Sequence, residues 1–393
     1  MFDFNKVVNR KGSFCTQWDF VEDRFGVKDL LPFTISDMDF STAPCVLEAL
    51  KERVEHGVFG YSRWQHNDFY QAISHWYDTR FNTLIKSDEL IYSPSVIYGV
   101  SELIRMWSQE EDHIILHTPA YDGFEKIINA NKRHYSPCPL YQEPMGTWLC
   151  DFDILEQQLK HPKATILILC SPHNPTGKVW TLEELRKIAR LAQQYGVKII
   201  SDEIHMDMCF SSNRHIPWQL VAIEDYAIFT SASKSFNFPA LGGAYGFISN
   251  KEDRKEYDYR LKQINSLSSP PIFFVLSHIS AYNHGDVWLD ALKKHLYGNL
   301  EYLQDKLNSD FPELNWHIPE STYLAWINLR ALNLESELLQ KTLIHSHRVA
   351  IMPGKIYGKP YENFIRLNVA CSRNKLEKGV NALIKAIKSM KSV

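Results

Sequence analysis

Short apolar segments alternate with amphipathic ones along the first 285 residues. The apolar segments are rich in Ile, Leu and Val and are bounded by polar turns, which is typical of strands buried on both faces of a sheet. They occupy residues 89–93, 113–117, 165–170, 197–201, 226–231 and 244–249. Helical patterns lie between several of them, and one opens with Thr181 and Glu184 spaced as a capping box. This alternation predicts an α/β fold whose mostly parallel sheet is flanked by helices.

After residue 285 the pattern becomes that of a smaller α+β domain. We expect helices at 287–308, 335–346 and 373–390 and strands at 322–329 and 363–368. The first 45 residues are aromatic and broken by turns, which predicts an extended arm that packs as part of the small domain. The predicted organisation is an arm at 1–45, a large domain at 46–284 and a small C-terminal domain at 285–393.

The composition of the chain argues against several classes of protein. The chain has 43 Lys and Arg against 46 Asp and Glu, a formal net charge of −3, so no basic excess indicates a nucleic-acid or anionic-membrane partner. Its 7 cysteines are scattered and never spaced as C-x-x-C, which argues against a disulfide framework and a zinc site. Neither a leader pattern nor an apolar run of about 18 residues is visible. We expect a cytoplasmic protein without a metal.

Candidate chemistry lies where predicted strands end. Lys234 stands in S-A-S-K-S-F directly after the strand at 226–231. Ligands of open α/β sheets bind at the carboxyl ends of strands. There the hydroxyls of Ser231 and Ser233 could bind a phosphate while the Lys234 amine forms an imine with an aldehyde. Taken alone the motif is weak, because a solvated loop lysine gives the same pattern.

Two other strand ends carry polar groups. Asp202 ends the strand at 197–201 and is either a helix cap or a carboxylate that pairs with a protonated pyridine nitrogen. Asn174 lies in S-P-H-N-P-T-G, a rigid turn that aims its amide at a fixed point or merely connects a strand to a helix. Since successive strand ends present an amide, an acid and an amine, we favour one common site.

These motifs resemble those of fold-type-I pyridoxal-phosphate (PLP) enzymes, the aspartate aminotransferase superfamily, and more narrowly the MalY/PatB group of cystathionine β-lyases. The resemblance extends over nearly the whole chain. It includes S-D-M-D-F (36–40), T-P-A-Y (118–121), T-Y-L-A-W (322–326) and F-I-R-L-N (364–368). It implies PLP as the cofactor, an amino-acid substrate and a two-domain fold.

The resemblance also implies roles for individual residues. Tyr121 should lie over the pyridine ring, although an aromatic residue near a strand end is otherwise usually core. Asn174 should reach the phenolic oxygen of PLP and Asp202 its ring nitrogen. His205 should border the cofactor at the place where many aminotransferases have a tyrosine. Lys234, Tyr121 and Asp202 are therefore the predicted catalytic residues.

The cofactor phosphate is expected at the start of a helix. Ser95, Val96 and Ile97 open the helical pattern at 99–109, and the first N–H groups of a helix are unpaired donors in a positive field. The hydroxyls of Ser231 and Ser233 would complete this cradle. Gly242 stands where many aminotransferases carry an arginine, which leaves the phosphate charge less neutralised and agrees with the lyase branch.

Two more residues are expected to complete the site. By resemblance, Tyr61 reaches the phosphate of a neighbouring subunit, which requires a homodimer with shared active sites; the alternative is a packed turn tyrosine. Arg366 is the expected clamp for the substrate carboxylate, together with Asn174, because a guanidinium matches a carboxylate bidentately. A salt bridge between Arg366 and a core Asp or Glu is the structural alternative.

The sequence thus predicts a PLP-dependent β-elimination on L-cystathionine or cysteine-like amino acids that gives a thiol, pyruvate and ammonia. A PLP-dependent aminotransferase is the alternative, because the two reactions diverge only after the α-carbanion. A non-catalytic regulator on this fold would be expected to lack Lys234 or Asp202. A nucleotide-binding enzyme is disfavoured by the missing glycine motifs.

Overall fold

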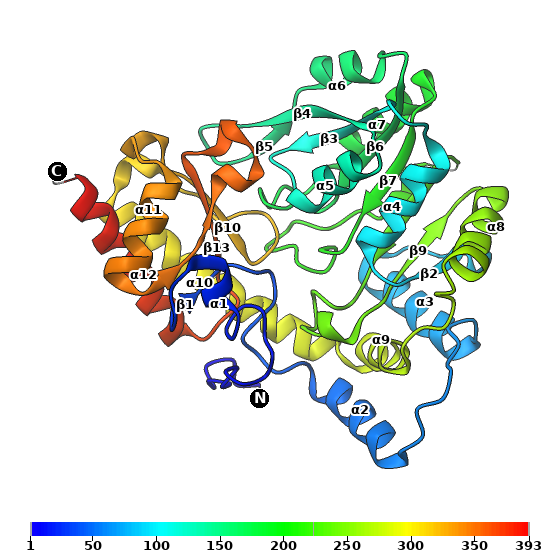
Figure 1. The fold of residues 1–393 in the computed structure, drawn as a ribbon, viewed down its shortest axis with the longest axis horizontal. Coiled ribbons are helices and arrows are strands. Elements are labelled where there is room, and N and C mark those ends of the chain that lie inside the picture. The colour runs from blue at the N-terminus through cyan, green and yellow to red at the C-terminus, as the bar shows by residue number, and fades with distance from the viewer. Residues whose placement is uncertain (1, 223, 392–393) are drawn as a thin grey trace.

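The computed structural model describes residues 2–222 and 224–391 (Figure 1). Eight strands form one sheet in the order β2-β9-β8-β7-β6-β3-β4-β5. Neighbours from β8 to β4 are parallel, whereas β9 and the edge strand β5 run antiparallel to their partners. The bounds are β2 Leu90–Ser93, β3 His113–Thr118, β4 His134–Gln142, β5 Trp148–Cys150, β6 Ala164–Cys170, β7 Lys198–Asp202, β8 Tyr226–Thr230 and β9 Ala244–Ile248.

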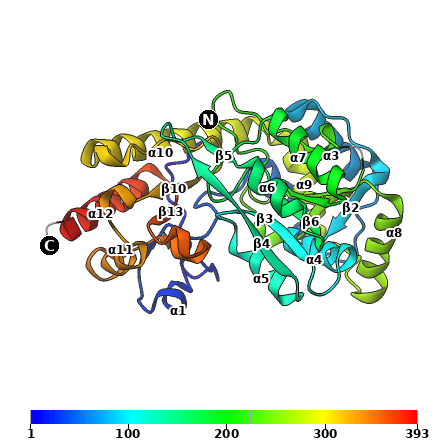
Figure 2. The ribbon, with the colours of Figure 1, turned by 90° about the horizontal axis from the view of Figure 1, so that it is seen from above.

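Helices cover both faces of this sheet. In Figure 2, α4, α5 and α8 lie on one side of the sheet and α3, α7 and α9 on the other. Because both faces are covered, every residue of β8 and β9 is buried. The helices are α3 Asn67–Phe81, α4 Val96–Trp107, α5 Asp122–Ala130, α6 Phe152–Leu159, α7 Leu182–Tyr195, α8 Lys251–Tyr259 and α9 Ile272–His284. The predicted fold class is confirmed, and so is the capping box of Thr181 and Glu184.

The C-terminal part forms a second, smaller unit. A three-stranded antiparallel sheet has the order β10-β13-β12, and its register pairs Trp326 with Arg366. α12 packs against α10 and α11 beside this sheet. The elements are α10 Asp286–Asp310, β10 Leu324–Asn328, α11 Ser336–Thr342, β11 Val349–Ala350, β12 Met352–Pro353, β13 Phe364–Asn368 and α12 Arg373–Lys391.

The N-terminal segment joins this smaller unit. Its short strand β1, Leu31–Pro32, pairs in parallel with β11, and its single turn of helix is α1, Val21–Phe25. The next helix, α2 at Pro44–His56, extends away from the body of the molecule in Figure 1. None of the helices in the described part of the chain is both long enough and apolar enough to cross a bilayer.

Element boundaries show where sequence patterns were misleading. α4 begins at Val96, three residues before the helical pattern does, because the Ser95 side chain caps it by accepting a hydrogen bond from the Tyr98 N–H at 3.1 Å. The strand β4 was not predicted, since Pro137 and Pro139 interrupt its apolar alternation. Each proline occupies a position in a long strand near the edge of the sheet.

Candidate active site

A cavity of about 230 Å³ opens at the carboxyl edge of the eight-stranded sheet. β3, β6, β7 and β8 run parallel, so the loops that follow them meet at this edge. Most of the residues chosen from the sequence line this one cavity. They are Ser95, Val96, Ile97, Tyr121, Asn174, Asp202, His205, Ser231, Ser233 and Lys234. Arg366 lies just behind the cavity wall, and Tyr61 lies elsewhere.

Lys234 is a fixed, partly buried amine and not a solvated loop lysine. Its Nζ donates to the main-chain oxygen of Ser36 at 3.0 Å and contacts the Ser36 hydroxyl at 3.3 Å. Burial lowers the pKa of this amine, and the neighbouring Arg366 adds to that effect, while Asp37 and Asp202 oppose it. A larger share of neutral amine at neutral pH is what a proton acceptor or nucleophile requires.

Asp202 is a buried carboxylate without a cationic partner of its own. Its Oδ1 accepts a hydrogen bond from the Ile204 N–H at 3.1 Å in a turn, so it does not cap a helix. Burial raises the pKa of Asp202 to about 7. No ion pair joins Asp202 to a Lys or Arg within the described residues. A ligand that brings a cationic ring nitrogen would therefore stabilise the ionised form.

His205 and Tyr121 border the same end of the cavity. Burial lowers the pKa of His205 to about 3, so the ring is neutral, and its Nδ1 has no hydrogen-bond partner among the described residues. The Tyr121 side chain is 39% exposed and is not a core residue. Gly123 leaves room for it, because a Cβ at that position would come within 2.4 Å of the Tyr121 ring.

The opposite end of the cavity offers donors for an anion. The N-terminus of α4 lines the cavity with Ser95, Val96 and Ile97, and the loop after β8 adds Ser231 and Ser233 to the same lining. Gly243 also lines this end at φ 82°, where a Cβ would clash with the Phe274 ring at 2.2 Å.

His278 on α9 supports this end and was not predicted from the sequence. Its Nε2 accepts a hydrogen bond from the Ala232 N–H at 3.1 Å and lies 3.2 Å from the Ser231 hydroxyl. Nε2 therefore carries no proton, and Nδ1 donates to the Phe274 main-chain oxygen at 2.8 Å. Burial lowers the pKa of His278 to about 4, which keeps the ring neutral.

Arg366 binds no carboxylate of the protein. Its Nη1 donates to the Asn174 side-chain oxygen at 3.1 Å and its Nη2 to the Thr34 main-chain oxygen at 2.9 Å. Its Nε is buried without a partner, and no ion pair to an Asp or Glu occurs in the part of the chain that the structure describes. The salt-bridge alternative is wrong, and Arg366 remains available to an anionic ligand beside Asn174.

Tyr61 is the predicted residue that the chain does not bring to the cavity. Its side chain is 100% exposed on the segment between α2 and α3. The alternative of a packed turn tyrosine is therefore wrong. Val58 and Phe59 of the same segment are also exposed, as are Leu47 and Val54 of α2.

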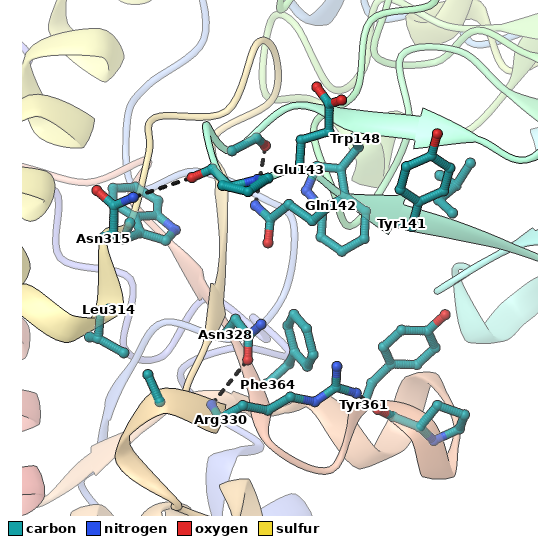
Figure 3. Close-up of a pocket in the computed structure, with 16 residues that line it drawn as sticks. Tyr141, Gln142, Glu143, Trp148, Leu314, Asn315, Asn328, Arg330, Tyr361 and Phe364 are labelled. Atoms are coloured by element: carbon teal, nitrogen blue, oxygen red, sulfur yellow. Dashed lines mark hydrogen bonds between the residues drawn. The ribbon is translucent and has the colours of Figure 1, made fainter.

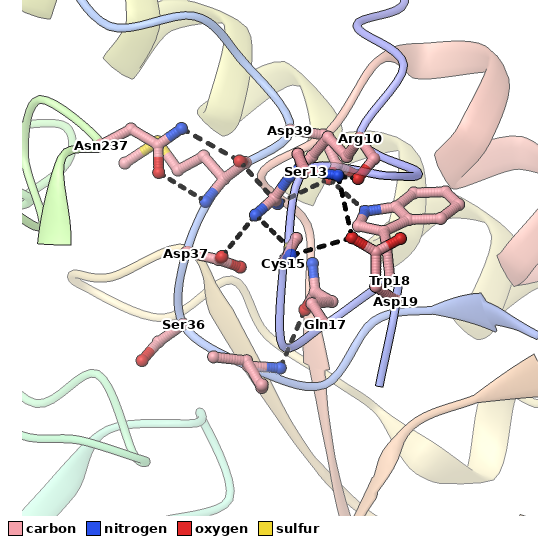
Figure 4. A network of polar contacts seen from close by, with 12 residues as sticks. Arg10, Ser13, Cys15, Gln17, Trp18, Asp19, Ser36, Asp37, Asp39 and Asn237 are labelled. Carbon is pink, nitrogen blue, oxygen red and sulfur yellow. Dashed lines mark hydrogen bonds and ion pairs between the residues drawn. The ribbon is translucent and has the colours of Figure 1, made fainter. Parts of the chain in front are cut away.

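The N-terminal arm fixes the wall opposite Lys234 through a polar network (Figure 4). Arg10 forms ion pairs with Asp37 at 2.6 Å and with Asp39 at 3.0 Å. Asn237 both accepts from the Met38 N–H at 2.9 Å and donates to the Met38 oxygen at 2.9 Å. The sequence marked this segment only by its motif and gave no sign of these contacts.

A larger cavity, about 560 Å³, separates the β4–β5 hairpin from the smaller unit (Figure 3). Aromatic side chains of Trp148, Tyr361 and Phe364 and the Arg330 side chain line it. It holds none of the predicted site residues, and no lysine occurs among the described residues of its lining. The smaller cavity at the sheet edge is therefore the candidate active site.

Sequence comparison defines the class of protein. The profile of the aminotransferase class I and II family matches residues 28–383, and the chain belongs to this family. Within the family it belongs to the MalY/PatB group. It is 55% identical to protein MalY of Escherichia coli K12 over 391 residues, which covers the whole of both chains. It is 31% identical to cystathionine β-lyase PatB of Bacillus subtilis 168, over 98% of this chain and 100% of PatB.

Solved structures named as an aminotransferase and as a C-S lyase share the fold. A PLP-bound protein from Clostridium difficile 630 superimposes with a TM-score of 0.94 at 32% identity, covering 98% of this chain and 100% of that one. The PLP-bound C-S lyase from Staphylococcus hominis gives a TM-score of 0.92 at 27% identity and covers 98% of each chain. Both of these similar structures hold PLP.

The residues present fit that cofactor. A partly buried lysine amine suits its aldehyde, and a buried carboxylate without a cationic partner suits its ring nitrogen. The N-terminus of α4, a helix of 12 residues, and two serine hydroxyls suit its phosphate.

Proposed function

We propose that this protein is a PLP-dependent carbon–sulfur β-lyase of the cystathionine β-lyase type, which acts on L-cystathionine or cysteine-like amino acids. The observation that carries the proposal is the single cavity in which the Lys234 amine, the Asp202 carboxylate and the Asn174 amide meet, with Arg366 bound to Asn174 behind its wall. The similarity over full length to cystathionine β-lyase PatB supports the same reaction. The products are a thiol, pyruvate and ammonia.

The chain's own residues divide the work of this reaction. When bound, PLP supplies an aldehyde for the substrate amine and a ring that withdraws electrons from the α-carbon. Arg366 holds the substrate carboxylate beside Asn174, where its unpartnered Nε is available. Lys234, with its lowered pKa, removes the α-proton as a general base. Asp202 keeps a proton on the pyridine nitrogen, and Tyr121 borders the ring.

Phosphate binding is assigned to the other end of the cavity. The N–H groups of Val96 and Ile97 and the hydroxyls of Ser95, Ser231 and Ser233 are the proposed donors. His205 borders the ring as a neutral imidazole because its pKa is lowered by burial.

Transamination is the competing reaction, because it uses the same residues up to removal of the α-proton. The test is to incubate the purified holoenzyme with L-cystathionine and to measure pyruvate without adding a keto acid. We expect continuous pyruvate and thiol release. An added keto acid that is converted into its amino acid, with no release of pyruvate or thiol, would assign the aminotransferase reaction instead.

We also propose a homodimer in which Tyr61 serves the neighbouring subunit. α2 extends from the body of the molecule in Figure 1, and the segment after it exposes Val58, Phe59 and the whole Tyr61 side chain. Apolar side chains exposed together are typical of a protein–protein interface. A phenol carried by such a segment would reach the phosphate end of a partner's cavity.

The predicted organisation stays part of this proposal. It divides the chain into an arm at 1–45, a large domain at 46–284 and a small domain at 285–393, of which residues 1, 223 and 392–393 lie outside the described residues. The strand pairing of β1 with β11 supports placing the arm with the small domain. A cytoplasmic location is supported by cysteines that are all free thiols.

A further inference from the structure

Three potential metal ligands meet in the sheet away from the active site. They are His117 near the end of β3, Cys138 in β4 and Cys150 in β5. Their ligand atoms all lie within 4.8 Å of one another, and the side chains are 1%, 0% and 6% exposed. The cluster is therefore sealed from solvent.

Strand register brings the three residues together, although their spacing along the sequence matches no metal motif. His117 and Cys138 are direct partners in the parallel pairing of β3 with β4. Cys150 lies opposite Leu140 in the antiparallel pairing of β4 with β5. Because side chains alternate between the faces of a strand, Cys138, Leu140 and Cys150 share one face.

The distances suit a cation that binds sulfur and nitrogen. The Cys150 Sγ lies 3.5 Å from the His117 Nε2. In a tetrahedral zinc site, Zn–S bonds of about 2.3 Å and Zn–N bonds of about 2.0–2.1 Å place sulfur and nitrogen about 3.6 Å apart and two sulfurs about 3.8 Å apart. The three ligand atoms would need little movement to bind such an ion.

The chemistry of the donors selects the kind of ion. Two thiolates and a neutral imidazole carry two negative charges, which a divalent cation neutralises, so the bound cluster is compatible with burial. Soft sulfur donors favour Zn²⁺ or Cu⁺ over Mg²⁺ or Ca²⁺. The Trp180 ring is centred 4.9 Å from that of His117, and all three ligand side chains are buried. This points to a structural ion rather than a catalytic one.

We propose that His117, Cys138 and Cys150 form a binding site for a thiophilic cation, Zn²⁺ or Cu⁺, which ties together β3, β4 and β5 at the edge of the sheet. The chain segment that follows His117 leads directly to the active site. Thr118, the next residue after His117, accepts a hydrogen bond from the Tyr361 hydroxyl of the smaller unit at 3.1 Å. Tyr121 follows three residues later in the wall of the cavity.

The test measures cation binding to the holoenzyme after treatment with a reductant and a chelator. Zn²⁺ is added, excess ion is removed by gel filtration, and bound zinc per chain is determined by elemental mass spectrometry. A parallel arm titrates Cu⁺ against a chromophoric competitor, and a third uses Co²⁺, whose bands report thiolate ligands. We expect one tightly bound ion per chain, thiolate-to-cobalt absorption and a higher melting temperature with Zn²⁺.

Matched variants locate the ion. Cys150→Ser and Cys138→Ser should lose the bound zinc and the rise in melting temperature, whereas Cys371→Ser, which alters an equally buried free thiol, should keep both. Circular dichroism and PLP content show that each variant is folded. An ion retained by folded Cys150→Ser, as expected for one bound to PLP or to surface groups, overturns the proposal. Wild-type protein that binds no ion also overturns the proposal. The same holds if Cys138 and Cys150 form a disulfide with each other in preference to binding the ion.

Discussion

Two regions of the molecule differ in how many contacts a single chain gives them: the loop that carries Lys234 and the segment that carries Tyr61. Lys234 is held by two contacts to Ser36 in a cavity whose walls come from several strand ends. Tyr61 is 100% exposed, with apolar neighbours that are exposed as well. Strand ends, the N-terminal arm and α9 together fix the first region, while the second is exposed in the single chain. The difference teaches that one chain holds the residues proposed for the chemistry, whereas the proposed role of Tyr61 requires a partner subunit.

Removing the amine should have the largest effect on the intramolecular half. Lys234→Ala is expected to lower kcat for pyruvate release about 10³-fold or more, because a positioned general base contributes about 10²–10⁴-fold and the covalent anchor is lost as well. An exposed-lysine control, Lys163→Ala, should keep wild-type turnover. Turnover within tenfold of wild type for Lys234→Ala would exclude this amine from the reaction.

Neutralising the carboxylate should have the next largest effect. Asp202→Asn keeps the size of the side chain and its hydrogen bond from Ile204, but it cannot stabilise a protonated pyridine nitrogen. We expect the variant to bind PLP and to lose activity about 10²-fold or more. Steady-state pyruvate release at saturating PLP measures this, and near-normal kcat would remove Asp202 from the mechanism.

The same carboxylate predicts a pH dependence in protein freed of PLP. Its pKa is raised from 3.8 to about 7 in the folded chain, so the folded state binds more protons than the unfolded state between these values. Stability attributable to Asp202 is present below about pH 4 and falls as the pH rises to about 7. The loss is on the order of 4 kcal/mol.

Denaturant unfolding of PLP-free protein across this pH range measures the loss. PLP-free Asp202→Asn should lack the decline and become the more stable protein above about pH 7. Parallel curves for the two proteins would mean that Asp202 ionises normally in the fold.

A smaller effect is expected behind the phosphate cradle. His278→Phe removes the acceptor for the Ala232 N–H and the contact with Ser231, which we expect to weaken PLP binding roughly fivefold to tenfold, at about 1 kcal/mol per neutral hydrogen bond. His278→Gln supplies an acceptor and should restore part of the affinity. Fluorescence titration of PLP-free protein gives these constants, and equal affinity in all three proteins would confine His278 to packing.

The strand-end residues could be predicted because each follows an apolar run closely in the sequence. Residues that are close in the sequence are also close in space, so a local pattern is enough to find them. Other contacts carry no such signal. Arg10 meets Asp37 and Asp39 across a separation of 27 and 29 residues, and His278 is one of several polar residues in the largely apolar helix α9. The prolines of β4 hid the strand that places Cys138 beside His117. Tertiary packing between distant segments created the first two groupings and strand register created the third, and local pattern encodes neither.

Mixed dimers test most directly whether the site combines an intramolecular half with a segment from the partner. Lys234→Ala and Tyr61→Ala subunits are unfolded together, refolded at equal amounts and assayed for pyruvate release at limiting PLP. Half of the dimers should be mixed, each with one site free of both lesions, so about a quarter of wild-type activity should return. Lys234→Ala mixed with Asp202→Asn should regain none, because these two residues share one cavity. Activity no higher than the sum of the parents, in verified mixed dimers of Lys234→Ala and Tyr61→Ala, would contradict the shared site.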